Sequence, residues 1–143
     1  NNVVESYVAQ LGEATSADVI LVPHFVRTIA AISAEEIEKY GCRYPVDRPH
    51  IADLISIVAH SGITGRHEAI QNADIRIRID FRKPDGATIR LAFKSIPSLP
   101  SSTTLDGFVN GKDASASRTL FAELSTWVKV LPAPTRIIKT DCF

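Results

Sequence analysis

Two of the four histidines, His60 and His67, are the residues with which acid–base or metal chemistry could begin. His67 and Glu68 begin like the zincin motif, in which a second histidine, one helical turn later, completes a zinc-binding pair. That position holds Gln71, so the motif fails and we predict no metal site. His60 and His67 flank a glycine-containing loop, and with Glu68 they are the weak candidates for a catalytic site. Histidines at helix ends are far more often solvent-exposed than catalytic.

Nucleophilic catalysis has no better support in the sequence. The chain contains no G-x-S-x-G elbow and no glycine-rich phosphate loop, and no base accompanies the Ser/Thr cluster at 101–104. Cys42 could join a Cys–His dyad, but that role competes with a disulfide. We therefore predict no cofactor and favour a non-enzymatic function. A small hydrolase whose residues converge only in the fold is the alternative.

Basic residues alternate with apolar ones in the segment 75–94. The candidate binding residues are Arg76, Arg78, Arg82, Arg90 and Lys94. Arginine captures carboxylates with paired hydrogen bonds and is enriched at protein interfaces. A solvated sheet face with a cross-strand ion pair to Asp80 is the simpler alternative. Because the net charge is zero and this face lacks aromatic residues, we expect a protein partner, an acidic one, rather than nucleic acid.

The same segment predicts a β-hairpin with a defined register. Its apolar residues fall on odd positions in both halves, so paired residues must have an even sum if one face is to be buried. A three-residue Pro84-Asp85-Gly86 loop satisfies this condition and places glycine in the left-handed position of a G1 bulge. A two-residue Asp85-Gly86 loop does not. The predicted pairs are Phe81 with Ile89, Ile79 with Leu91, and Ile77 with Phe93.

The remaining elements follow from apolar spacing and turn residues. Helices are predicted at 3–11, 49–61 and 117–131. A capping box over 33–36 predicts a short fourth helix. Further strands are predicted at 18–25, 105–109 and 136–139, and 42–47 is interpreted as a loop. The predicted fold class is α+β, with an antiparallel sheet of about four or five strands around a central hairpin at 73–96, packed on one face by two or three helices.

Length and composition set limits on the class of protein. The chain has 143 residues, of which 45% are hydrophobic and 22% charged, which is typical of a globular domain and excludes a disordered chain. No linker or repeat divides it, so we expect a single domain over 1–143. No apolar run approaches the ~20 residues of a transmembrane helix.

The two cysteines and the first residue indicate a compartment. Cys42 follows a predicted helix and Cys142 is one residue from the C-terminus, so a disulfide between them would anchor a terminus that otherwise frays. The chain begins at Asn1 and contains no methionine, which suits a mature form after signal-peptide removal or a trimmed fragment. Because disulfides persist in oxidising compartments, we expect a periplasmic or secreted protein. Two free thiols in a cytosolic protein are the alternative.

These observations favour one class of function. We expect an exported protein-binding domain, either an inhibitor or an immunity-type protein that blocks a toxin or a hydrolase. The loops at 62–72 and 95–104 are the expected recognition segments, because loops on a rigid scaffold commonly carry binding residues. The alternatives are the small hydrolase and a carrier of a small apolar or anionic ligand.

Overall fold

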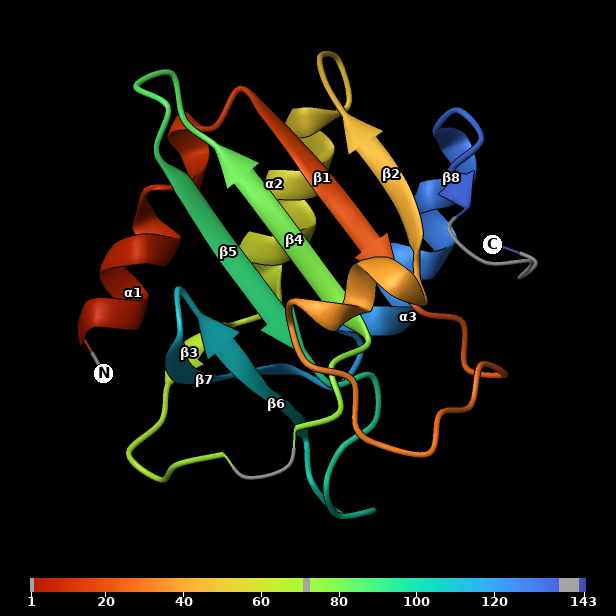
Figure 1. The fold of residues 1–143 in the computed structure, drawn as a ribbon. Coiled ribbons are helices and arrows are strands. Elements are labelled where there is room, and N and C mark those ends of the chain that lie inside the picture. The colour runs from red at the N-terminus through yellow and green to blue at the C-terminus, as the bar shows by residue number, and fades with distance from the viewer. Residues whose placement is uncertain (1, 71–72, 137–141) are drawn as a thin grey trace.

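The structure, a computed structural model, describes residues 2–70, 73–136 and 142–143. These residues form one antiparallel sheet of eight strands in the order β3-β7-β6-β5-β4-β1-β2-β8 (Figure 1). The strands are β1 (Ser16–Leu21), β2 (Cys42–Val46), β3 (Thr64–Gly65), β4 (Ile77–Arg82), β5 (Thr88–Phe93), β6 (Thr104–Val109), β7 (Lys112–Ser117) and β8 (Thr135–Arg136). The predicted α+β class with four or five strands is therefore wrong. The described chain is mostly β, with one large sheet.

The central hairpin of β4 and β5 has the predicted register. The structure pairs Phe81 with Ile89, Ile79 with Leu91, and Ile77 with Phe93. At the turn the Lys83 N–H donates to the Ala87 carbonyl at 2.9 Å, and Gly86 has a φ of 89°. A positive φ of this kind favours glycine, so turn chemistry and face parity select the same three-residue loop.

In the described chain, three strands that the sequence did not predict enlarge the sheet: β2, β3 and β7. The segment 42–47, predicted as a loop, contains β2. On its outer side β2 pairs with β8 only through Cys42 and Arg43, so Pro45 lies at an open part of the sheet edge. Proline is tolerated at such a position. β7 has the sequence KDASAS, and its inward positions are Ala114 and Ala116, both buried. Alanine contributes too little apolar surface to give a recognisable strand pattern.

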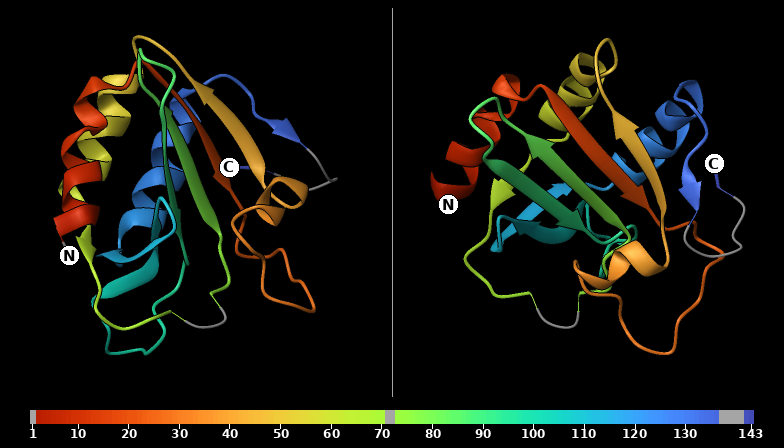
Figure 2. Two further views of the ribbon diagram at one scale, coloured as in Figure 1. Left: turned by 60° about the vertical axis from the view of Figure 1, so that its left-hand side comes forward. Right: turned by 45° about the horizontal axis from the view of Figure 1, so that its top comes forward.

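Three helices cover one face of the sheet (Figure 2). They are α1 (Asn2–Ala9), α2 (Ile51–His60) and α3 (Leu120–Trp127), with short 3-10 turns η1 (Leu11–Glu13) and η3 (Val128–Val130). The predicted helices at 49–61 and 117–131 contain α2 and α3, and the predicted helix at 3–11 overlaps α1 except at its first residue. The main core lies between the helices and the inward side chains of the strands, among them Val19, Ile79 and Leu91, all fully buried.

The opposite face, called the outer face below, is partly covered by the segment 22–40, which contains η2 (Glu36–Lys39). A second apolar cluster joins this segment to the sheet through Ile37, Ile20 and Ala92. The predicted capping box is present: the Glu36 N–H donates to Ser33 Oγ at 3.1 Å, and the Ser33 N–H donates to the Glu36 carboxylate at 3.4 Å. It begins a 3-10 turn rather than a full helix.

The predicted disulfide is present between Cys42 of β2 and Cys142, whose Cα atoms are 6.0 Å apart. Arg136, where a final strand was predicted over 136–139, pairs with Cys42 in β8, and 137–139 lie outside the described residues. Within the described residues, no helix combines the length and the apolar character needed to cross a bilayer.

Candidate functional site

Four of the five predicted cationic binding residues are paired with acidic side chains of the chain itself: Arg76, Arg78, Arg82 and Arg90. Arg78 is 4% exposed, and its NH2 lies 2.6 Å from Glu38 Oε1 and 3.1 Å from Asp80 Oδ2. Arg90 Nε lies 2.7 Å from the other oxygen of Asp80. The Arg78 NH1 also donates to the Ala34 carbonyl at 2.9 Å, so this side chain attaches the η2 segment to the sheet.

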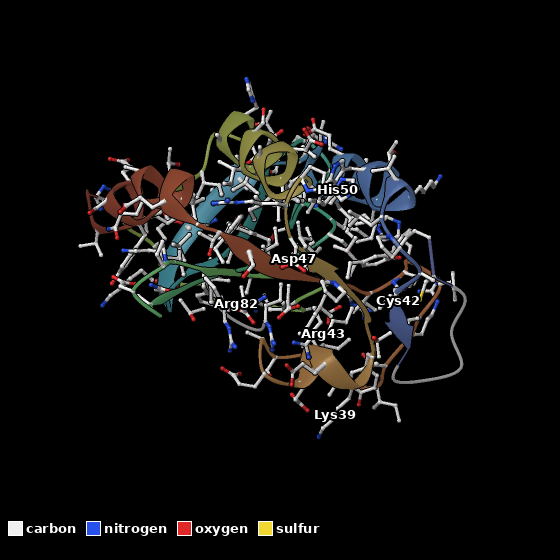
Figure 3. The ribbon with its side chains drawn as sticks, turned by 90° about the horizontal axis from the view of Figure 1, so that it is seen from above. Lys39, Cys42, Arg43, Asp47, His50 and Arg82 are labelled. Carbon is white, nitrogen blue, oxygen red and sulfur yellow. A yellow bond between two sulfur atoms is a disulfide. The ribbon has the colours of Figure 1, made fainter. Side chains whose placement is uncertain are left out.

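The third paired residue, Arg82, shares a buried carboxylate with Arg43. Asp18 of β1 lies between β4 and β2, and it accepts from Arg82 NH1 at 2.7 Å and from Arg43 NH2 at 2.8 Å. Figure 3 shows both arginines on the outer face, away from the helices. Burial by itself raises the pKa of the Asp18 carboxyl, but the hydrogen bonds from Arg43 and Arg82 outweigh burial and hold that pKa below its ordinary 3.8.

The Asp18 carboxylate should therefore make stability depend on pH in the acid range. A carboxyl with a depressed folded-state pKa stabilises the fold above its unfolded-state pKa, and this stabilisation is lost as the pH falls through the folded-state value. We expect Asp18→Asn to lower the free energy of unfolding near neutral pH and to matter progressively less below about pH 4. Urea unfolding of both proteins across this range measures the difference. A difference that does not change with pH would contradict the assignment.

The other two predicted residues, Arg76 and Lys94, lie at one end of the sheet, and the strand pairing explains why. Leu21 of β1, Ile77 of β4 and Phe93 of β5 are lateral neighbours in three adjacent strands. The segments that follow β1, precede β4 and follow β5 must therefore leave the sheet at the same end. Arg76 and Lys94 adjoin the paired residues Ile77 and Phe93, where the regular register ends: the Arg76 N–H donates to the Phe93 carbonyl at 3.0 Å, so Arg76 does not pair directly with Lys94.

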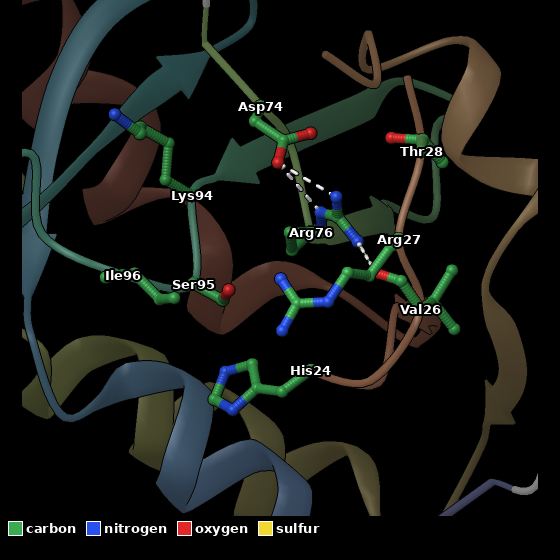
Figure 4. A pocket seen from close by; sticks show the side chains of 9 residues that line it. All are labelled: His24, Val26, Arg27, Thr28, Asp74, Arg76, Lys94, Ser95 and Ile96. Carbon is green, nitrogen blue, oxygen red and sulfur yellow. Dashed lines mark hydrogen bonds and ion pairs between the residues drawn. The ribbon is translucent and has the colours of Figure 1, made fainter. Parts of the chain in front are cut away.

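A pocket of about 310 Å³ lies where these three segments meet (Figure 4). Arg76 is held in place there: its Nε donates to Asp74 Oδ2 at 3.0 Å, and its NH1 donates to the Val26 carbonyl at 2.8 Å. The ring of His24 stacks on Phe121 of α3, with 4.3 Å between the ring centroids. The lining residues are His24, Val26, Arg27, Thr28, Asp74, Arg76, Lys94, Ser95 and Ile96.

Arg27 is the pocket residue that the sequence did not identify. Its exposed side chain extends across the pocket in Figure 4, and it makes no hydrogen bond or ion pair with any described residue. Lys94 Nζ donates to Ser98 Oγ at 2.9 Å, a neutral partner. Among the described residues that line the pocket, three are cationic and one, Asp74, carries a carboxylate. The pocket has a local excess of positive charge although the whole chain is neutral.

The weak catalytic candidates do not form a reactive group in the structure. His60 ends α2, where its Nδ1 lies 2.7 Å from the Ser56 carbonyl. His67 and Glu68 are exposed, and Glu68 lies 3.8 Å from Arg66. Among the described residues, no group of three or more His, Cys, Asp or Glu side chains could hold a metal ion.

Large apolar side chains are exposed on the loops around the pocket. Phe25 is 63% exposed and Ile29 is fully exposed, both on the segment after β1. Ile96 and Leu99 are 62% and 64% exposed on the predicted recognition loop at 95–104. The other predicted recognition loop, 62–72, includes residues 71 and 72, which lie outside the described residues.

Comparison of the chain with family models, with curated proteins and with solved structures gave no match. Function must therefore be inferred from the residues and geometry of the site, which is where function resides even when a fold is familiar.

Proposed function

We propose that this chain is a non-enzymatic protein-binding domain, an inhibitor or an immunity-type protein, that binds its partner at the pocket end of the sheet. The observation that carries the proposal is the exposure of four large apolar side chains on two loops that border one cationic pocket. These residues are Phe25, Ile29, Ile96 and Leu99. The surface that they form with Arg27 is called the loop-end surface below.

The composition of the loop-end surface resembles that of a protein interface. Interfaces are enriched in aromatic residues and arginine, and a few such side chains supply most of the binding energy. Single exposed apolar residues are common, but several of them around a concave site indicate an interaction surface. The charge of the pocket favours a partner that presents an acidic side chain among apolar ones.

The proposal includes export to the periplasm or the extracellular medium. The disulfide between Cys42 and Cys142 supports it, because glutathione and thioredoxin keep cytosolic thiols reduced. A blocking protein in such a compartment must resist unfolding and proteolysis, and a cross-link that closes a long loop contributes to that resistance.

Site-specific photo-crosslinking tests the proposal. p-Benzoylphenylalanine would be incorporated in place of Phe25 or of Ile96, and the protein irradiated in a periplasmic or secreted extract of the source organism. We expect a covalent adduct with one partner protein, identified by mass spectrometry. With the purified partner, Phe25→Ser should raise the Kd at least about tenfold, the effect of removing an interface hot spot.

Val130 provides the matched control. It is as exposed as Phe25, at 64%, but it lies in η3 after the end of α3. The photoreactive residue at Val130 should give no adduct with the same partner, and Val130→Ser should change the Kd by less than about twofold. Adducts of equal yield at all three positions, or none at Phe25 and Ile96, would contradict a specific loop-end surface.

A further inference from the structure

We propose that the pocket between β1, β4 and β5 binds the carboxylate of an acidic side chain from the partner, through Arg27 and Arg76. This inference rests on the proposed function and names the group that the loop-end surface recognises. Arg27 and Arg76 are the two arginines among the described residues that line this pocket, and the inference assigns a role to Arg27, whose side chain has no partner in that part of the chain.

Arg76 is oriented for binding before any ligand arrives. Asp74 accepts from its Nε and lies 2.9 Å from its NH2, and the Val26 carbonyl accepts from its NH1. A guanidinium has five N–H donors, so these contacts leave donors on the two terminal nitrogens. The side chain is 13% exposed, which means that little conformational entropy remains to be lost on binding.

Arg27 supplies the donors that Arg76 lacks. All five of its side-chain N–H groups are without a partner among the described residues, and the guanidinium lies in the middle of the pocket in Figure 4. A carboxylate could therefore accept two parallel hydrogen bonds from Arg27, the strongest arrangement for this pair of groups. Val26 and Ile96, which also line the pocket, would contact the methylene groups behind the carboxylate.

The arrangement of charge is unfavourable without an anion. Arg76 and Lys94, which adjoin the paired residues Ile77 and Phe93, both line the pocket together with Arg27, and like charges at such a site repel one another. Asp74 compensates for one of them, and Lys94 has a neutral partner in Ser98. A bound anion would remove this repulsion, so the sheet end gains stability when the pocket is filled.

The existing acceptors favour a carboxylate over a phosphate. Asp74 already accepts at Nε and NH2 of Arg76, and the Val26 carbonyl accepts at NH1, so acceptor oxygens lie against all three nitrogens of this side chain. The additional charged oxygens of a phosphate would lie close to these acceptors and be repelled by them. A planar carboxylate that binds at the free fork of Arg27 avoids them.

NMR titration tests the inference without the partner protein. The probe is N-acetyl-glutamate amide, with its uncharged analogue N-acetyl-glutamine amide as the control ligand, added to the ¹⁵N-labelled intact chain at low ionic strength. We expect the charged probe to shift the amide signals of 24–28, 74–76 and 94–96 with a Kd on the order of millimolar, and the uncharged analogue to leave them unchanged. Arg27→Gln should raise the Kd at least about tenfold.

Arg48 offers the matched variant. It is exposed, makes no ion pair with a described residue, and follows β2 at the other end of the sheet, so Arg48→Gln should change the Kd by less than about twofold. Inorganic phosphate is the third ligand. Phosphate binding at least about tenfold tighter than the glutamate probe, or failure of the glutamate probe to bind, would overturn the carboxylate assignment.

The two proposals fail separately. If the crosslinked partner binds Arg27→Gln as tightly as the unchanged chain, the loop-end surface stands and the carboxylate site is overturned. If the glutamate probe binds at Arg27 while no partner crosslinks at Phe25 or Ile96, the anion site stands and the protein-binding function is overturned.

Discussion

Reduction of the disulfide between Cys42 and Cys142 is expected to lower the free energy of unfolding more than any single surface substitution. The bond links positions 100 residues apart. Closing a loop of that length removes conformational entropy from the unfolded chain worth up to about 4.7 kcal/mol in the chain-entropy model. Guanidinium unfolding of the oxidised and reduced protein measures the difference, which should appear as a shift of the midpoint.

Two controls separate the cross-link from local packing. Cys42 is 1% exposed in β2, so its substitution also creates a small packing defect. Reduction leaves both side chains in place and is the cleaner measurement. The double variant Cys42→Ser/Cys142→Ser should be insensitive to reductant, and intact mass after alkylation should show no free thiol in the untreated protein. A difference below about 1 kcal/mol between the oxidised and reduced chain would contradict the expected contribution.

The sequence predicts local structure well where one physical rule leaves a single solution. In the hairpin, the parity of the apolar residues and the chemistry of the Pro84-Asp85-Gly86 turn both require the same register, which the structure confirms. The capping box at Ser33 is likewise a local feature, and both of its hydrogen bonds are present.

The size of the sheet could not be predicted because its outer strands are defined by their neighbours. β2 is held by pairing with β1 and by the disulfide, although Pro45 argues locally against a strand. β7 buries only alanines on its inner side and depends on pairing with β6, where Gly107 lies opposite Ala114. Any side chain at Gly107 would collide with the backbone of β5, so this close approach requires glycine.

The candidate site shows the same division between local and long-range information. The alternation of charge places Arg76 and Lys94 at the same end of one hairpin, and both line the pocket. The sequence could not show that Arg78 and Arg82 are paired, since their partners Glu38 and Asp18 lie 40 and 64 residues away along the chain. Arg27 was missed for a related reason: only the position of β1 beside β4 brings its loop to the pocket.

Arg78 links the fold to the candidate site, because it anchors the segment that continues the Arg27 loop. The side chain is buried, and it donates to the Ala34 carbonyl and to Glu38, which lie in and beside η2. Truncating one member of a buried ion pair costs about 3–5 kcal/mol when the other charge is left unpaired in the interior. In Arg78→Ala, Glu38 is half-exposed and Asp80 retains Arg90 as an ion-pair partner. We therefore expect the free energy of unfolding to fall by about 3 kcal/mol, the lower end of that range.

The measurements for Arg78→Ala are thermal unfolding and amide hydrogen exchange. A loss of this size should lower the Tm by about 10 °C. The amides of Ile37 and Gly41, which donate to carbonyls within the η2 segment, should exchange faster even under conditions where the sheet remains protected. Arg78→Met, which keeps much of the packing but none of the hydrogen bonds, separates the two contributions.

Arg82→Ala is the matched comparison for Arg78→Ala, since both arginines are on β4 and both pair with a carboxylate. Arg82 is 43% exposed and its partner Asp18 retains Arg43, so its loss should cost less than about 1 kcal/mol. Equal costs for the two variants would show that Arg78 does not attach η2 to the sheet. Because η2 and the Arg27 loop are parts of one segment, Arg78→Ala should also weaken binding of the glutamate probe, whereas Arg82→Ala should leave it unchanged.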